Sequence, residues 1–114
     1  MPVITESNLD PNDRLAQLSA SARRLLDFVA VLPGGASYAL LRHVVRLTEP
    51  DMIADLRESV EAGILAAVPG RPNAYDFTGE TLRAIVLERI GPERLPKLRA
   101  RAEAARSRVE GPDA

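Results

Sequence analysis

The sequence has no cysteine, no long apolar run and almost no lysine, and these absences exclude several classes of protein. Without cysteine the chain has no disulfide framework and no thiolate metal site, which fits the reducing cytoplasm where we expect it to act. No apolar stretch approaches the ~20 residues of a transmembrane helix, and the polar start MPVITESNLDPNDR lacks the pattern of a signal peptide. The net charge of −1 gives no overall attraction for nucleic acid or an anionic membrane.

The remaining composition is that of a small globular protein. A length of 114 residues suits one domain with a modest core, and the 46% hydrophobic and 27% charged residues are ordinary for a folded chain. Every basic residue except Lys97 is an arginine. Because the planar guanidinium pairs with carboxylates through two hydrogen bonds, this bias suits protein contacts as well as phosphate contacts.

The first half of the sequence predicts successive amphipathic helices. The predicted helix starts are, in order, Asp13, Ser19 or Ser21, Ser37 and Thr48. Serine and threonine at such positions accept hydrogen bonds from the free amides of the first helical turn. Pro33-Gly34-Gly35 should end the second of these helices, and Gly63 should end the fourth. The inner face of the fourth helix is predicted to consist of Met52, Ile53, Leu56 and Val60.

The second half predicts a hairpin followed by two more helices. Residues 64–78 read as two short strands around a turn that contains Pro69 and Gly70, and a helix then runs to Gly91-Pro92. A last helix near 93–109 places Leu95, Leu98, Ala102, Ala105 and Val109 along a narrow apolar seam at spacings of 3 and 4.

These elements predict a mainly α fold with a winged helix–turn–helix core, a short two-stranded hairpin and a C-terminal arm helix. We expect a flexible leader over residues 1–12, the winged-helix domain over 13–91, the arm helix over 92–110 and a tail over 111–114.

Several segments resemble the winged-helix module that follows the ATPase core in STAND-type signal ATPases, especially large bacterial LuxR-type transcriptional regulators. The matching residues are Leu18-Ser19, Arg23-Arg24-Leu25-Leu26, Glu61-Ala62-Gly63-Ile64-Leu65, Tyr75-x-Phe77 and the helical Arg83, within roughly residues 14–105. The resemblance implies a regulatory module that docks against the ATPase core or a helical-repeat domain. The sequence departs from the family at Thr78-Gly79, where family members usually carry Arg-His and where in several STAND proteins a histidine contacts the nucleotide. A nucleotide-sensing role is therefore not expected at this position.

The segment TEPDMIADLRESVEAGIL occupies the position of a DNA-reading helix but is acidic. Its carboxylates are Glu49, Asp51, Asp55, Glu58 and Glu61, against the single basic residue Arg57. Phosphate contacts need lysine or arginine, so this helix is a poor DNA reader. We predict instead that these acids form a contact surface for an arginine-rich protein partner, with a solvated acidic face as the plain alternative.

The arm helix is the one basic segment of the sequence. It carries arginines on either side of the apolar seam, and we predict that Leu95, Leu98, Ala102 and Ala105 contact a partner domain or a second copy of the chain. The alternative function is a small winged-helix DNA-binding regulator that dimerises through this helix. In that case the nucleic-acid contacts would come from Arg71, Arg99, Arg101 and Arg106.

Neither catalysis nor a cofactor is predicted. The only histidine, His43, stands between Arg42 and Arg46 without a sequence-near nucleophile or carboxylate, so we expect it on a helix surface. Asp51, Asp55 and Glu58 share one helical face, but a single helix cannot surround a divalent cation with six oxygens. The chain also has no glycine-rich phosphate loop ending in Lys-Ser or Lys-Thr, so ATP hydrolysis is not expected from these residues.

Overall fold

The computed structural model describes residues 11–71 and 73–109, which fold into a mainly helical structure with a small antiparallel sheet. The predicted leader (residues 1–10 of it) and the tail (111–114) lie outside these residues, as does Glu110. In chain order the elements are α1 (Pro11–Ala16), α2 (Ala20–Ala30), β1 (Ala36–Ser37), α3 (Tyr38–Val44), α4 (Glu49–Glu61), β2 (Leu65–Ala67), β3 (Ala74–Phe77) and α5 (Glu80–Val109). The mainly α class is therefore confirmed.

Side-chain caps begin three of the helices, at the positions that the sequence predicts. The Ser19 hydroxyl accepts from the Ala22 amide at 3.2 Å, the Ser37 hydroxyl from the Leu40 amide at 3.1 Å, and the Thr48 hydroxyl from the Asp51 amide at 3.3 Å. Each bond satisfies an amide that has no partner inside its own helix. Local sequence therefore fixes where α2, α3 and α4 start.

The sheet has three strands in the order β1-β3-β2, so the predicted two-stranded hairpin is incomplete. Strand β1 pairs antiparallel with β3 through Ala36 opposite Tyr75 and Ser37 opposite Ala74. Only glycine fits just before β1, because a Cβ atom on Gly35 would lie 2.6 Å from the Tyr75 carbonyl oxygen and the residue has a φ of +93°. A strand of two residues is too short to show an alternating pattern, which is why the sequence did not reveal it.

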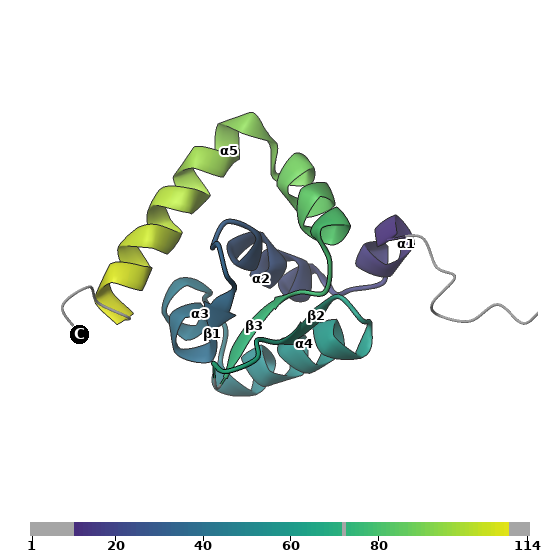
Figure 1. The fold of residues 1–114 in the computed structure, drawn as a ribbon, viewed down its shortest axis with the longest axis horizontal. Coiled ribbons are helices and arrows are strands. Elements are labelled where there is room, and N and C mark those ends of the chain that lie inside the picture. Colours follow the sequence, from purple (N-terminus) through teal and green to yellow (C-terminus); the bar gives the residue numbers. More distant parts are fainter. Residues whose placement is uncertain (1–10, 72, 110–114) are drawn as a thin grey trace, which may run out of the picture.

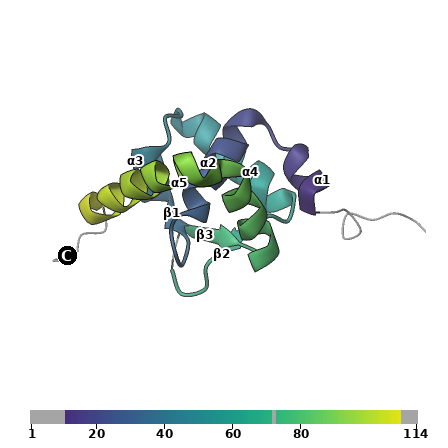
Figure 2. The same cartoon turned by 90° about the horizontal axis from the view of Figure 1, so that it is seen from above.

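Helix α5 is bent into two halves at Gly91, which has φ 87° and ψ 158° and is followed by Pro92. Figure 1 shows α5 as an inverted V above α2, with the sheet and α4 below. Figure 2, from above, shows the same bend over the other helices. The second half, residues 92–109, is called the arm below. The predicted break at Gly91-Pro92 is confirmed, since a positive φ followed by proline interrupts a helix.

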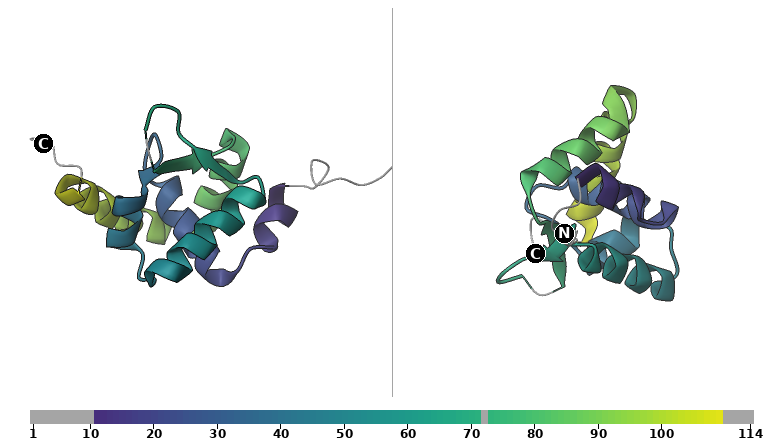
Figure 3. Two further views of the ribbon diagram at one scale, coloured as in Figure 1. Left: turned by 90° about the horizontal axis from the view of Figure 1, so that it is seen from below. Right: turned by 90° about the vertical axis from the view of Figure 1, so that its right-hand side faces the viewer.

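One hydrophobic core joins all these elements. Helix α2 supplies its centre, with Ala22, Leu25, Leu26 and Val29 almost fully buried, and α3, α4 and both halves of α5 pack around it. Figure 3 shows α4 running along the face opposite α5 when the molecule is seen from below. None of the helices in the described part of the chain has the length and apolarity needed to cross a bilayer.

Candidate functional site

Helix α4 turns a different face to the core from the one the sequence predicts. Met52 and Leu56 are buried as expected, but Ile53 and Val60 are 45% and 41% exposed. Asp55 and the fully buried Ser59 take the inward positions instead. Ser59 is satisfied there, because its hydroxyl donates to the Asp55 carbonyl one turn earlier at 2.9 Å. The prediction that Ile53 and Val60 lie inside is therefore wrong.

This orientation of α4 separates the five carboxylates of the predicted acidic contact surface. Glu49, Asp51 and Glu61 are exposed, but the Asp55 side chain is buried and cannot join an exposed surface. Glu58 is half-buried and accepts from the Ser19 amide at 2.9 Å and the Ser19 hydroxyl at 3.1 Å. Glu58 thus completes the N-terminal cap of α2, where a carboxylate also suits the helix dipole. Of the five predicted carboxylates, Asp55 is therefore buried, Glu58 caps α2, and the other three are exposed.

The outward face of α4 borders a groove of about 650 Å³, which we call the α4 groove. Its walls are Tyr38, Glu49, Ile53, Leu56, Arg57, Val60, Glu61, Asn73 and Tyr75. The Tyr38 hydroxyl donates to Glu49 at 3.4 Å, and desolvation together with the Glu49 carboxylate raises the pKa of Tyr38. The groove is apolar in its middle and acidic at both ends, with Arg57 as its only basic side chain.

The apolar seam of the arm is used inside the chain. Leu98, Ala102 and Ala105 are buried in the common core, and Leu95 packs against it half-buried. The prediction that these residues contact a partner or a second copy needs correction, because other elements of the same chain already cover them. The sequence could not distinguish the two cases, since an apolar seam has the same spacing whichever surface it meets.

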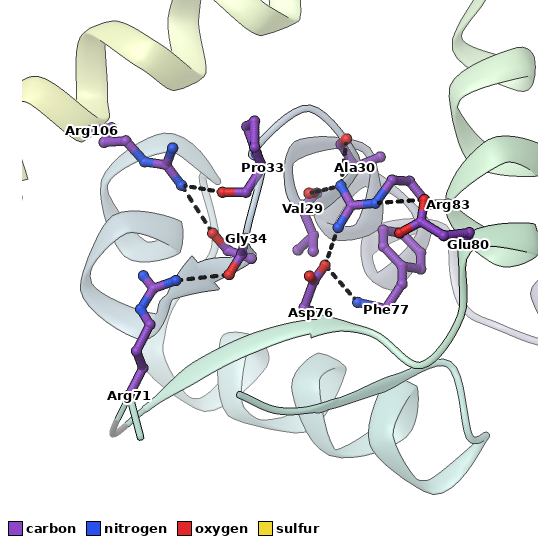
Figure 4. Close-up of polar contacts among 11 residues, drawn as sticks. Val29, Ala30, Pro33, Gly34, Arg71, Asp76, Phe77, Glu80, Arg83 and Arg106 are labelled. Carbon is purple, nitrogen blue, oxygen red and sulfur yellow. Dashed lines mark hydrogen bonds and ion pairs between the residues drawn. The ribbon is translucent and has the colours of Figure 1, made fainter. Parts of the chain in front are cut away.

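Three of the four arginines of the predicted alternative nucleic-acid contact lie around the turn before β1, and two of them bind its backbone. Arg71 donates to the Gly34 carbonyl at 2.7 Å, and Arg106 donates to the carbonyls of Pro33 and Gly35 at 3.1 Å each, so both hold the turn before β1 (Figure 4). The guanidinium of Arg101 lies 5.4 Å from the centre of the Phe28 ring. Arg99 is exposed and borders a hollow with Glu103 that Pro33 and Gly34 of the same turn also line. Two of the four predicted contacts, Arg71 and Arg106, therefore have a structural role that their sequence positions did not indicate.

Arg83 is the centre of a polar network that joins three elements of the fold (Figure 4). It donates to the Ala30 carbonyl at 2.9 Å and to the Val29 carbonyl at 3.4 Å, at the C-terminal end of α2. It also pairs with Asp76, and its guanidinium lies 5.3 Å from the centre of the Phe77 ring. A cation at a helix C-terminus satisfies free carbonyls and suits the helix dipole. This network therefore joins α2, β3 and α5, which is a structural role.

The residues that could suggest nucleotide binding, catalysis or a metal site do not form such a site in the described part of the chain. The Thr78 hydroxyl donates to the Gly63 carbonyl at 2.8 Å. His43 is exposed on α3. Within residues 11–71 and 73–109 no three side chains of histidine, cysteine, aspartate or glutamate converge as metal ligands would. The α4 groove is thus the strongest candidate for a binding site.

Comparisons of the chain with protein-family models, with characterised proteins and with solved structures found no match. The geometry and charge of the surfaces described above are therefore the basis for the proposed function.

Proposed function

We propose that this chain is a non-catalytic, cytoplasmic protein-interaction module with a winged-helix architecture, which docks partner domains through the α4 groove. The element order supports the architecture: helix, short strand, two helices and then a hairpin, with the strands in the order β1-β3-β2. In this arrangement α4 takes the place of the helix that reads DNA in winged-helix regulators. The resemblance to STAND and LuxR-type regulators supports a partner such as an ATPase core or a helical-repeat domain.

The observation that carries the proposal is the outward face of α4. It exposes Ile53 and Val60 between Glu49 and Glu61, and among the described residues of the groove Arg57 is the only cationic side chain. Protein binding sites commonly have an apolar centre inside a polar rim, whereas DNA affinity depends mainly on lysine and arginine contacts to phosphates. The α4 groove has the first pattern.

The charges of the groove indicate the kind of segment that would fit. Glu49 and Glu61 are twelve positions apart on α4, which at about 1.5 Å per residue places them about 18 Å apart along the helix. A partner helix with large apolar side chains in its middle and a basic residue near each end would match this surface. Opposite charges at the rim would orient the partner and speed its association.

A titration with two probes tests the proposal. The positive probe is a synthetic amphipathic helix with leucines on one face and lysines about 18 Å apart along it; the second probe is a mixed-sequence DNA duplex. We expect the peptide to shift the NMR amide signals of α4 and β3, and the paired change Ile53→Ser with Val60→Ser to weaken binding at least about tenfold, since it removes the apolar contacts.

The matched control is Ala54→Ser with Ala84→Ser, because both alanines are exposed and lie outside the groove. This control should bind as the unchanged chain does. Peptide binding that is equal in both double variants would contradict the proposal. DNA binding near micromolar concentration that falls steeply with salt would contradict it as well, and would support a DNA-binding regulator.

A further inference from the structure

A second surface, away from the α4 groove, gathers arginines that lie far apart in the sequence. Two hollows of about 400 and 440 Å³ lie along α2, one toward the bend of α5 and the other toward the end of α3. Their basic side chains are Arg23, Arg24, Arg46, Arg89, Arg94 and Arg101, which together we call the arginine face. Neither hollow shares a lining residue with the α4 groove.

The charge of this face differs sharply from that of the whole chain. The chain has 15 basic and 16 acidic residues, yet among the described residues that line the two hollows Asp27 is the only carboxylate. Six arginines against one aspartate give this described lining a net charge of +5. Asp27 lies 3.6 Å from Arg94, so one arginine is already partly neutralised. An excess of this size attracts an anionic partner.

Three of these arginines have no partner within the described residues. Arg89 donates to Asn12 at 3.0 Å, and Arg101 lies over Phe28. Arg23, Arg24 and Arg46 are exposed, and no hydrogen bond or ion pair links them to residues 11–71 or 73–109. Arg24 lines both hollows and therefore stands at the centre of the face.

The floors of the two hollows are apolar. Leu26, Val86 and Ile90 line the first, and Phe28, Val44 and Val45 line the second. A nucleic-acid backbone brings phosphates but no aliphatic groups to such floors. A polypeptide segment with both carboxylates and large apolar side chains would use the rim and the floor together, and arginine binds carboxylates in a planar, two-bond geometry.

We propose that the arginine face binds an acidic polypeptide segment that carries large apolar side chains. This site is separate from the α4 groove and does not depend on the function proposed for it. Carboxylates of the segment pair with Arg23, Arg24 and Arg46, and its apolar side chains cover the floors of the two hollows. Since Arg24 lines both hollows, it is expected to contribute most to the binding energy.

The test uses the full chain and a synthetic amphipathic helix with glutamates on one face and leucines and phenylalanines on the other. Binding is followed by fluorescence anisotropy of the labelled peptide. We expect Arg24→Glu and Arg46→Glu each to weaken binding at least about tenfold, because charge reversal replaces attraction by repulsion. Both arginines are exposed, and thermal unfolding followed by circular dichroism will show whether each variant folds.

The matched control is Arg57→Glu, which makes the same charge change in the α4 groove. It should bind the acidic peptide within about twofold of the unchanged chain, because its separation from the arginine face leaves only a screened effect. The proposal is overturned if the unchanged chain does not bind the peptide near ~1 mM. Equal losses in Arg57→Glu and Arg24→Glu, or displacement of the peptide by an equal concentration of DNA duplex, overturn it too. The lysine peptide and the Ile53→Ser with Val60→Ser variant test the α4 groove separately, so failure at one surface is distinguishable from failure at the other.

Discussion

Helix α4 and the arm of α5 use their apolar residues in opposite ways. On α4, two large apolar side chains, Ile53 and Val60, are exposed, while the carboxylate of Asp55 is buried. On the arm, Leu98, Ala102 and Ala105 are all buried in the core of the same chain, and charged residues such as Arg99 and Glu103 stay outside. The arm therefore follows the amphipathic pattern of its sequence, and α4 departs from it.

This difference indicates which helix has exposed apolar side chains that a partner could contact. Burying apolar area stabilises a fold by roughly 25 cal/mol per Å², so a helix that leaves large apolar side chains outside gives up part of that stabilisation. Departures of this kind between local pattern and tertiary placement are expected at functional sites. The comparison supports the proposal that α4 offers apolar side chains to a partner, whereas the apolar side chains of the arm are structural.

The largest expected effect tests whether the arm belongs to the core. Ala102 is fully buried, whereas Ala104 is exposed. Ala102→Arg should lower the free energy of unfolding by about 3 kcal/mol or more, because it forces a charge and a long side chain into a packed site. Ala104→Arg should change it by less than about 0.5 kcal/mol. Thermal unfolding followed by circular dichroism measures both, and equal midpoints would mean that the arm is not packed as described.

The next effect tests which face of α4 is buried. Met52 and Ile53 are neighbours in the sequence, but Met52 is fully buried and Ile53 is 45% exposed. Met52→Ala should cost about 2–5 kcal/mol of unfolding free energy, because it leaves a cavity in the core. The cost of Ile53→Ala should stay below about 1 kcal/mol. Urea titrations give both values, and a larger loss for Ile53→Ala would reverse the assignment of the two faces.

A smaller effect, of opposite sign, is expected at the buried carboxylate of α4. Among the described residues Asp55 Oδ2 has no hydrogen-bond partner. Asp55→Asn keeps the shape and removes the buried charge, so it should raise the free energy of unfolding by about 1 kcal/mol. The control Asp51→Asn changes an exposed carboxylate in the first turn and should lower stability by about 0.5 kcal/mol, because it loses a favourable dipole interaction. Urea denaturation measures the free energy of unfolding of both variants. A lower value for Asp55→Asn than for the unchanged chain would contradict the placement of this side chain.

The smallest effect concerns Asp27, which ties α2 to Arg94 of the arm. Burial raises the pKa of the Asp27 carboxyl above its ordinary 3.8, and Arg94 offsets only part of this rise. The unfolded chain therefore releases this proton at lower pH than the folded chain does. The contribution of Asp27 to the free energy of unfolding is fully present below pH 3.8. It is lost as the pH rises through the higher pKa that Asp27 has in the folded chain.

Asp27→Asn should remove this loss of stability at higher pH, because asparagine does not titrate. The melting temperature of Asp27→Asn relative to the unchanged chain should rise as pH increases upward from 3.8 through the folded pKa. Glu88→Gln, at an exposed position on α5, is the control and should show no such trend. A difference that stays constant with pH, or moves in the other direction, would contradict the burial of Asp27.

Features decided within one helical turn were predictable from the sequence. The caps at Ser19, Ser37 and Thr48 depend on a hydroxyl two or three residues before an amide, and the breaks at Gly63 and Gly91 depend on a backbone conformation that glycine tolerates. The mainly α class and the order of the helices follow from these signals together with the apolar stripe of α2.

Only the tertiary structure decided which face of each helix is buried and which side chains from distant segments lie together. Helix α4 carries more apolar residues than one face can bury, and its packing against α2 placed Met52, Leu56 and the small Ser59 inside while Ile53 and Val60 stayed outside. The arginine face joins α2, the end of α3 and α5, and its charge cannot be found by counting along the sequence. Helix starts and ends depend on neighbouring residues, but burial and surface charge depend on which segments meet in space, so the sequence alone left both proposed binding surfaces undecided.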